Sequence, residues 1–280
     1  MTLSQLLIDD AVKRALEEDL GQAGDITSLA CISANANSTA AIIAREEGVI
    51  AGANLARAAF RFIDTDIEIS NRKNDGDFVG DGDVVMSIDG PSRGILSAER
   101  VALNFLGRLS GVATATAALV NAVSGTHAKI VCTRKTTPLL RAFEKYAVRC
   151  GGGFNHRYGL YDAVMIKDNH VAAAGGIAEA LKAAKAAVGH MTPIEIEVDT
   201  IEQLEEALEH GARIVLLDNM TLDDLRLAVS LNKGRAILEA SGGVTLKTVR
   251  AIAETGVDVI SSGAITHSAP SLDLGLDFQD

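Results

Sequence analysis

Short apolar runs alternate with amphipathic segments over residues 129–263, and this alternation limits the folds that the chain can adopt. The segments between the later runs, such as IEQLEEALEHG at 201–211, carry apolar residues at helical spacing. A repeat of strand then helix predicts parallel strands joined by helical crossovers, either as a barrel or as a sheet of βα units. The apolar runs are KIVCTRK, DAVMIKD, IEIEVDT, RIVLLDN, AILEASG and VDVISSG.

Polar or charged residues end nearly every apolar run. In parallel βα barrels the carboxyl ends of the strands share one rim, so residues that are distant in sequence come together there. The sequence therefore predicts a functional site at this rim. The residues at the run ends are Arg134, Lys135, Lys167, Asp168, Glu197, Asp218, Glu239, Ser241 and Ser262.

Positive charge is concentrated in one segment of a chain whose formal net charge is −11. Residues 134–167 carry seven Lys or Arg residues against two acids, with three glycines at 151–153 among them. Such a cluster in an acidic protein indicates a multiply charged anionic ligand. The net acidity and the aromatic content of 4% argue against nucleic-acid binding.

Composition favours a cytoplasmic globular protein. The chain has 280 residues with 48% apolar content, enough to bury a large core. We expect no membrane span, because no apolar run approaches ~18 to 20 residues, and the first 20 residues read as an amphipathic helix rather than a signal peptide. Cys31, Cys132 and Cys150 are odd in number and widely spaced, which fits neither a disulfide framework nor paired zinc ligands.

The first 111 residues have a mixed pattern that predicts a smaller N-terminal domain. We expect a strand pair over TAAIIAREEGVIAG at 39–52, and tight hairpins at Asp75-Gly76, Asp81-Gly82 and Asp89-Gly90. A long helical stretch at 97–123 leads into the βα region. We therefore predict a domain over 1–111, on which the tail 270–280 packs, and a βα domain over 112–269.

Two glycine-containing loops follow the last two predicted strands. Small residues in Ser241-Gly242-Gly243 and Ser262-Gly263-Ala264 would let backbone N–H groups approach a phosphate. Glu197 and Asp218 occupy equivalent positions on neighbouring strands. They suit sugar hydroxyls or Mg²⁺, or simply pair with nearby cations.

Lys167 lies within an apolar run, where a lysine needs an anionic partner or serves in Schiff-base chemistry. His156 stands between Asn155 and Arg157, and these polar neighbours favour a position that faces a ligand over a core position.

Several sequence blocks resemble the quinolinate phosphoribosyltransferase family. The most specific is TRKTTPLLRAFEKYAVRCGGGFNHRYGLYDAVMIKDNH at 133–170. The blocks GDITS, SAERVALNFLGRLSG, EIEVDT, LLDNM, EASGGV and ISSGAITHSAPSLDLGLD extend the similarity over nearly the whole chain. The chain has TTPLLR where the family commonly has TTPGLR, and SSGA where SVGA is frequent. The resemblance implies an α/β fold with a C-terminal open or incomplete parallel βα barrel and a smaller N-terminal α+β sandwich domain.

The resemblance also implies an activity in NAD biosynthesis. The phosphoribosyl group of phosphoribosyl pyrophosphate would pass to the ring nitrogen of quinolinate, with loss of CO₂ and pyrophosphate, to give nicotinate mononucleotide. These reactants carry two carboxylates, a phosphate and a pyrophosphate, which suits a cationic rim. Mg²⁺ is the implied cofactor, held mainly by the substrate near Glu197 and Asp218.

The roles that the resemblance implies fall on rim residues and on one helix residue. The implied catalytic residues are Lys135, Glu197 and Asp218, of which Lys135 contacts both substrates. Arg100 is implied to reach across a dimer interface into the partner's site, so we expect at least a homodimer. The implied quinolinate site is formed by Arg134, His156, Arg157 and Lys167, and the implied phosphate site by Ser241, Gly242, Gly243, Ser262 and Gly263. Thr133 and Ala264 are further implied substrate-binding residues.

Three alternatives remain at this point. A related protein from molybdenum-transport operons would share the fold and part of the motifs, but the intact TRK, NHR and IKDNH blocks favour quinolinate. A Schiff-base lyase or aldolase would use Lys167, and the surplus of arginines around this lysine argues against it. A non-catalytic sensor of a phosphate ligand would bind the same molecules without turnover.

Overall fold

The computed structural model describes residues 2–279, which divide into two compact units. Unit 1 comprises the residues up to 117, residues 142–152 and the residues from 269 onward, and unit 2 comprises 118–141 and 153–268. The division differs from the predicted ranges because helix α4 (Ser92–Ala122) continues through residue 111 without a break. Helix α5 (Arg141–Cys150) also lies almost wholly in unit 1, although unit 2 contains the segments on both sides of it.

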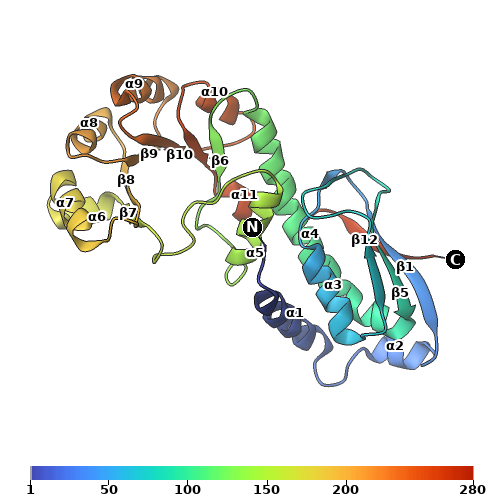
Figure 1. Cartoon of the computed structure of the whole chain (residues 1–280). Coiled ribbons are helices and arrows are strands. Elements are labelled where there is room, and N and C mark those ends of the chain that lie inside the picture. The colour runs from blue at the N-terminus through green and yellow to red at the C-terminus, as the bar shows by residue number, and fades with distance from the viewer. Residues whose placement is uncertain (1, 280) are drawn as a thin grey trace. The chain divides into compact units, whose positions relative to one another are not determined.

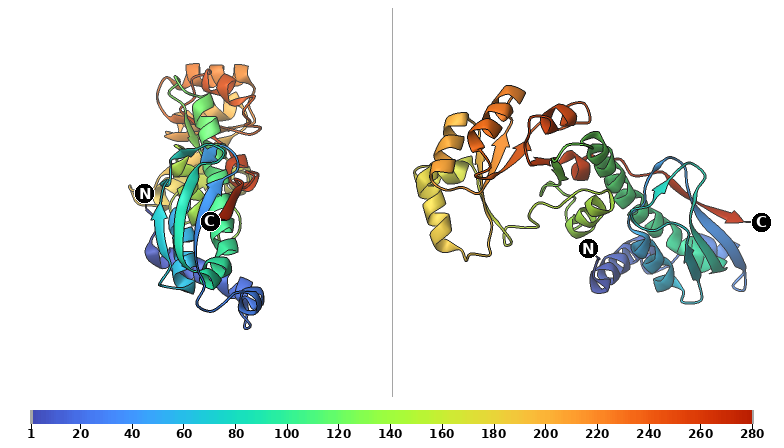
Figure 2. Two further views of the ribbon diagram at one scale, coloured as in Figure 1. Left: turned by 90° about the vertical axis from the view of Figure 1, so that its right-hand side faces the viewer. Right: turned by 45° about the horizontal axis from the view of Figure 1, so that its top comes forward.

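Unit 1 is built on a four-stranded antiparallel sheet with the strand order β12-β1-β5-β3. Figure 1 shows α3 and α4 beside this sheet, and Figure 2 shows β12 at its edge next to β1. The elements of unit 1 besides α4 and α5 are α1 (Gln5–Leu20), α2 (Ile26–Cys31), β1 (Asn37–Ala44), β2 (Gly48–Val49), α3 (Ala53–Ile63), β3 (Glu68–Asn71), β4 (Phe78–Val79), β5 (Val84–Pro91) and β12 (Leu274–Gln279).

The predicted local strand pairing in unit 1 is wrong. Strand β1 pairs with β5 and β12, whereas β2 pairs with β4, so the expected strand pair over 39–52 does not form. The chain passes from β3 through β4 to β5, and β5 pairs back with β3. The Asp75-Gly76 and Asp81-Gly82 turns therefore lie on either side of β4 rather than between paired strands, and Asp89-Gly90 lies inside β5.

Glycines of α4 allow the C-terminal segment to approach the helix closely. A Cβ atom at Gly111 would lie 1.9 Å from the carbonyl oxygen of Pro270, and one at Gly107 would lie 2.9 Å from that of Leu272. The Leu272 N–H donates to the Gly107 carbonyl at 2.9 Å. The GRLSG block thus has a packing role that brings β12 into the sheet.

Helix α4 is long and apolar enough, by length and composition alone, to cross a membrane. More than half of its apolar window, 56%, is buried inside the structure. Ala98, Ala102, Leu106 and Ala113 are fully buried. The apolar composition of α4 is therefore that of a core helix.

Unit 2 is a six-stranded parallel sheet with helices along its outer face (Figure 1). The strand order is β6-β11-β10-β9-β8-β7, and an isolated parallel bridge joins Val131 of β6 to Phe154. Within residues 2–279 no ladder joins β7 to Phe154, so the predicted open parallel βα barrel is confirmed. The strands are β6 (Lys129–Val131), β7 (Val164–Ile166), β8 (Ile194–Val198), β9 (Ile214–Asp218), β10 (Ile237–Ser241) and β11 (Val259–Ser261).

The helices of unit 2 follow the strands as the strand–helix repeat predicts. Helix α8 begins at a capping box, in which the Thr200 hydroxyl accepts from the Gln203 N–H and the Gln203 side chain accepts from the Thr200 N–H. Helix α10 is short, with five residues. The helices are α6 (Asp168–Ala174), α7 (Ile177–Ala187), α8 (Ile201–Glu209), α9 (Leu222–Asn232), α10 (Val249–Ala253) and α11 (Ala264–His267).

Candidate active site

A cavity of about 420 Å³ lies at the carboxyl ends of the parallel strands of unit 2. Residues from all six strands or their following loops line it, so the predicted gathering of strand ends is what the structure contains. The lining residues are Thr133, Arg134, Lys135, His156, Arg157, Met165, Lys167, Glu197, Leu216, Asp218, Glu239, Ser241 and Ser261.

Strand alternation explains which residues face the cavity. Side chains two positions apart in a strand point to the same face of the sheet. Leu216 and Asp218 of β9 both line the cavity, as do Glu239 and Ser241 of β10. On β11 the cavity side chain is therefore Ser261, one position before the predicted Ser262.

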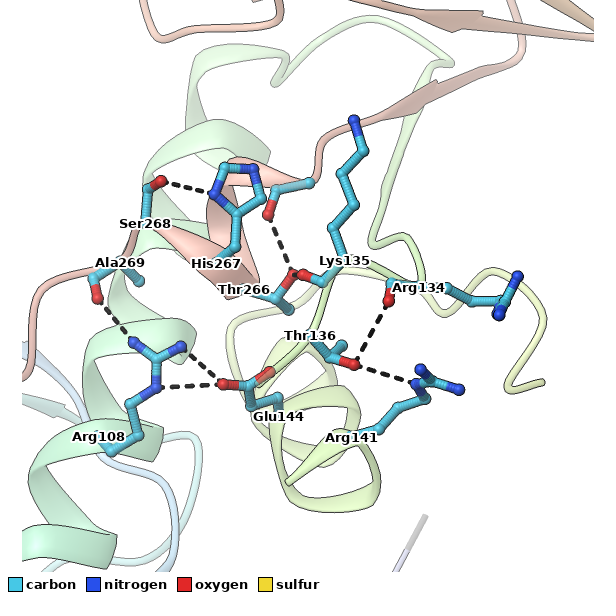
Figure 3. Close-up of polar contacts among 11 residues, drawn as sticks. Arg108, Arg134, Lys135, Thr136, Arg141, Glu144, Thr266, His267, Ser268 and Ala269 are labelled. Carbon is cyan, nitrogen blue, oxygen red and sulfur yellow. Dashed lines mark hydrogen bonds and ion pairs between the residues drawn. The ribbon is translucent and has the colours of Figure 1, made fainter. Parts of the chain in front are cut away.

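The loop that carries Arg134 and Lys135 is held by hydrogen bonds to a backbone carbonyl and to a side-chain hydroxyl (Figure 3). The Thr266 hydroxyl donates to the Lys135 carbonyl at 2.8 Å. The Arg141 guanidinium donates from Nε to the Thr136 hydroxyl at 3.0 Å and from Nη1 to the Tyr158 carbonyl, also at 3.0 Å. Figure 3 shows the Arg134 and Lys135 side chains extending from the loop in different directions.

Arg134 and Arg157 bring two guanidinium groups to the same cavity. Burial, followed by the charge of Arg134, lowers the pKa of Arg157. The buried Nε atoms of both arginines have no hydrogen-bond partner among residues 2–279. Since like charges repel and buried donors without partners are costly, an anionic group with several acceptor oxygens is the ligand that would stabilise this pair.

His156 lies between two groups of the protein itself. The backbone N–H of Arg157 donates to Nδ1 of His156 at 2.8 Å. On the other side of the ring, Nε2 lies 2.8 Å from a carboxylate oxygen of Glu195 and 3.9 Å from one of Glu239. The structure thus places His156 in the cavity with both ring nitrogens engaged.

Glu195 and Glu239 are part of the site. The sequence places Glu239 at the predicted rim without a role, and it does not single out Glu195. Both side chains are buried, with residue exposures of 5% and 4%. Burial and the charge of Glu195 raise the pKa of Glu239 to about 7. The available signal was the run IEIEV, in which Glu195 stands two positions before Glu197 and therefore points to the same face of the strand.

Glu197 and Asp218 lie on neighbouring strands at the edge of the cavity. Glu197 forms an ion pair with Lys167, and Asp218 accepts a hydrogen bond from the Asn219 side chain at 2.7 Å. Two carboxylates suit a Mg²⁺ ion whose other ligands come from substrate phosphates and water. The chemistry of these donors therefore fits a substrate-held Mg²⁺.

The two glycine loops each place backbone atoms close to a neighbouring side chain. Gly242 has φ of +94°, and a Cβ atom there would lie 2.0 Å from Oδ1 of Asn219. A Cβ atom at Gly263 would lie 2.9 Å from Cδ of Lys135. Glycine thus permits this close approach in both loops. The backbone N–H of Ser262 donates to the Val131 carbonyl at 3.0 Å and is therefore already engaged within the sheet. The remaining loop residues, Gly243 and Ala264, are exposed.

Arg100 lies on α4 in unit 1. Its side chain is 63% exposed, and its guanidinium is 3.8 Å from the carboxylate of Glu99. Arg100 is not among the residues that line the cavity in the described part of the chain. Its predicted role in a partner's site stays a prediction.

The fold and the site together define a class of protein. Unit 2 presents a cationic cavity at the carboxyl end of a parallel βα sheet, with carboxylates on the adjacent strand ends. This is the arrangement of an α/β-barrel enzyme that acts on a small polyanionic substrate.

Comparisons with known proteins identify the family. The model of the quinolinate phosphoribosyl transferase C-terminal domain matches residues 112–277, and that of the N-terminal domain matches residues 25–110. The chain therefore belongs to the quinolinate phosphoribosyl transferase family.

Relatives and solved structures agree with this membership over nearly the full length. A Bacillus subtilis (strain 168) protein named probable nicotinate-nucleotide pyrophosphorylase (carboxylating) is 47% identical over 93% of this chain and 89% of its own length. A Mycobacterium leprae (strain TN) protein named nicotinate-nucleotide pyrophosphorylase (carboxylating) is 45% identical over 96% of both chains. The solved structure of the nicotinate-nucleotide pyrophosphorylase from Francisella tularensis superposes with a TM-score of 0.96 at 41% identity, over 99% of this chain and 98% of that one.

Proposed function

We propose that this enzyme transfers the phosphoribosyl group of phosphoribosyl pyrophosphate to quinolinate, with decarboxylation. The products are nicotinate mononucleotide, CO₂ and pyrophosphate, which places the reaction in NAD biosynthesis. The observation that carries the proposal is the pair Arg134 and Arg157, whose guanidinium groups share one cavity with Lys135, Glu197 and Asp218. The names of the relatives and the family membership support the same reaction.

The proposed quinolinate site is the cationic side of the cavity. Guanidinium groups match planar carboxylates as forks, and each charged hydrogen bond contributes roughly 1.5 to 3 kcal/mol. Arg134 and Arg157 would bind the two ring carboxylates, with Lys167 adding a third positive charge. This arrangement would hold the pyridine nitrogen towards the ribose and exclude water from it.

The proposed donor site lies on the carboxylate side. Glu197 and Asp218 would bind the ribose hydroxyls and stabilise positive charge that develops at the sugar carbon as pyrophosphate departs. Lys135 would neutralise part of the charge on the leaving pyrophosphate. When bound, Mg²⁺ would supply further neutralisation beside Glu197 and Asp218. Ser241, Gly242, Gly243, Ser261, Gly263 and Ala264 are the residues proposed to surround the 5′-phosphate.

Bond changes in the proposed reaction balance without a redox partner. The pyridine nitrogen forms a bond to the ribose carbon as the bond from that carbon to pyrophosphate breaks. The resulting pyridinium then loses its adjacent carboxylate as CO₂, because the electron pair left on the ring carbon is next to a positive nitrogen. A proton then adds to that carbon.

The contact between Lys167 and Glu197 disfavours the Schiff-base alternative. A lysine that attacks a carbonyl has to be a neutral amine. In this protein the Lys167 amine forms an ion pair with Glu197 at the cavity. Borohydride trapping with a carbonyl substrate is expected to leave the protein unlabelled.

The proposed functional unit is a homodimer in the cytoplasm, with Arg100 donated to the site of the partner. The exposed guanidinium of Arg100 supports this role, since it carries charge that only a 3.8 Å contact to Glu99 offsets in the described structure. The location is part of the proposal, because some plant relatives in the same family are named as chloroplastic or mitochondrial.

A turnover assay tests the proposed function. Purified protein given quinolinate, phosphoribosyl pyrophosphate and Mg²⁺ is expected to release nicotinate mononucleotide, pyrophosphate and CO₂ in equal amounts. Nicotinate lacks one carboxylate and is expected to react at least about tenfold less efficiently, since one charged contact is lost. Binding of both substrates without product would instead favour the sensor alternative, and a preference for nicotinate would contradict the dicarboxylate site.

A further inference from the structure

The hydrogen bonds around His156 determine where its proton lies. Nδ1 accepts from the backbone N–H of Arg157 at 2.8 Å, and an imidazole nitrogen that accepts a hydrogen bond carries no proton. The proton of the neutral ring is therefore on Nε2, from which it is donated to Glu195 at 2.8 Å. The structure assigns His156 to the neutral Nε2–H tautomer, held from both sides.

Glu195 is the acceptor that selects this tautomer. It is the second residue of β8 and is 5% exposed, and a buried carboxylate is costly unless it is hydrogen-bonded. Its Oε2 atom makes the contact with His156, whereas its Oε1 atom has no hydrogen-bond partner among the described residues. Glu239 is farther away, at 3.9 Å from Nε2.

Arg157 is at the other end of this series of contacts. Its backbone N–H is bound by His156, and its guanidinium donates from Nη1 to the Ala163 carbonyl at 3.1 Å. Burial and the charge of Arg134 lower the pKa of Arg157, and the charge of Glu195 raises it. Glu195 therefore acts on Arg157 both through His156 and through its charge.

We propose that Glu195 is a positioning residue for dicarboxylate binding, and that it acts by fixing His156, which in turn orients Arg157. The inference rests on the proposed function, because it takes a carboxylate of quinolinate as the ligand of Arg157. His156 acts on the arginine through the backbone N–H of Arg157, which donates to its Nδ1 atom.

The cluster of His156, Glu195 and Glu239 could alternatively bind a metal ion. The potential ligand atoms of His156, Glu195 and Glu239 lie within 4.8 Å of one another. A histidine that binds a metal through Nε2 carries its proton on Nδ1 and donates it to an outer acceptor. Nδ1 of His156 instead faces the N–H donor of Arg157, so the tautomer that a metal requires is disfavoured.

Substitutions of Glu195 separate a positioning role from a purely structural one. Glu195→Leu removes the acceptor, and we expect the KM for quinolinate to rise at least about tenfold while the KM for phosphoribosyl pyrophosphate stays within about twofold. Glu195→Gln keeps an amide oxygen that can accept from Nε2, and we expect the quinolinate KM to return to within about threefold of wild type. Glu205→Gln, on the exposed face of α8, is the matched control.

The outcomes that would overturn the proposal are specific. An unchanged quinolinate KM in a folded Glu195→Leu protein would do so, as would equal rises in both KM values, or a Gln variant no better than Leu. Lack of turnover by the wild-type protein would contradict the proposed function and leave the tautomer assignment to be judged separately.

Nitrogen NMR of wild-type protein labelled with ¹⁵N-histidine tests the tautomer assignment of His156 without any variant of Glu195. The His156 signals are identified by their loss in His156→Gln, and the expected pattern is a neutral ring protonated on Nε2. A ring protonated on Nδ1, or on both nitrogens, would overturn the proposal. So would displacement of the Nε2 proton when Zn²⁺ is added at stoichiometric concentration.

Discussion

Lys167 and Glu197 form an ion pair between the ends of neighbouring strands β7 and β8. In the proposed reaction the two residues serve different substrates, since Lys167 binds quinolinate and Glu197 binds the ribose. Substrate binding therefore exchanges a contact within the protein for two contacts with ligands. The pairing and the binding roles are compatible, because side-chain exposures of 43% and 14% leave the pair at the cavity surface.

Substitution of each partner is expected to affect a different substrate. Lys167→Met should raise the KM for quinolinate about tenfold, and Glu197→Gln should raise the KM for phosphoribosyl pyrophosphate by a similar factor, since each loses a charged contact. Stability should change by less than about 1 kcal/mol, because the pair is partly exposed. Steady-state kinetics with each substrate varied in turn provide the measurement. If both variants changed only the unfolding free energy, the pair would be structural.

Glu239 is expected to make the stability of the protein depend on pH. Its folded pKa is about 7, whereas its ordinary value is 4.5, so between these two pH values the unfolded chain releases the proton and the folded chain keeps it. The stability that this carboxyl contributes below its unfolded pKa is therefore lost as the pH rises towards 7. Glu239→Gln has no carboxyl proton to release. Over this pH interval its free energy of unfolding should therefore fall by up to about 3 kcal/mol less than that of the wild-type protein.

Urea unfolding of wild type and Glu239→Gln at about pH 4.5 and pH 8 measures this difference. We expect the wild-type protein to lose more stability over that interval than the variant does. Parallel losses in the two proteins would show that Glu239 titrates in the folded state much as it does in the unfolded chain.

Leu139 is held in a conformation that suits glycine. Its φ is 67°, in the left-handed region, and the residue is 93% exposed. The position corresponds to the glycine of the TTPGLR block that is common in the family. A left-handed L-residue costs roughly 1 to 2 kcal/mol, of which the greater freedom of glycine in the unfolded chain offsets about half.

Leu139→Gly is therefore expected to raise the unfolding free energy by about 0.5 to 1 kcal/mol. Leu160→Gly is the matched control, because Leu160 is also an exposed loop leucine, at 74%, and its φ is not positive. That control should lose stability. Chemical denaturation of the wild-type protein and the two variants measures their free energies of unfolding. An equal change of the same sign in both variants would contradict the assignment of strain to residue 139.

Arg100 is expected to complement a site defect in another subunit. Assayed at a quinolinate concentration well below the KM, Arg100→Ala and Arg157→Ala should each have about a tenth of the wild-type activity or less as homodimers. After unfolding and refolding as an equal mixture, half of the dimers are mixed and each contains one intact site, so about a quarter of the wild-type activity should return. Activity that remains at the level of the separate variants would show that Arg100 serves its own subunit or none.

The sequence predicts the site better than it predicts the pairing in unit 1. Strand ends converge in any parallel βα sheet, so polar residues such as Arg134 and Asp218 could be placed at one rim from their positions alone. Strand β12 pairs with β1 across most of the chain, and no local pattern carries that information. Asp-Gly turns indicate where the chain bends, and they do not say which strands pair after the bend.

Buried polar residues are the part of the site that sequence patterns conceal. Glu195 lies in an apolar run, where a charged residue resembles the exposed member of an alternating strand. Its burial follows from the packing of the folded chain, in which it contacts His156. The engagement of both ring nitrogens of His156 likewise depends on the positions of Glu195 and the Arg157 backbone, which only the folded arrangement gives.

The KM for quinolinate in Arg134→Ala and Arg157→Ala shows whether these two arginines bind the dicarboxylate. Each variant loses a charged contact to a carboxylate, so the quinolinate KM is expected to rise at least about tenfold while the KM for phosphoribosyl pyrophosphate changes by less than about twofold. Arg226→Ala, on the exposed part of α9, controls for the loss of a surface arginine. A wild-type quinolinate KM in both site variants would contradict the claim that these strand-end cations hold the dicarboxylate.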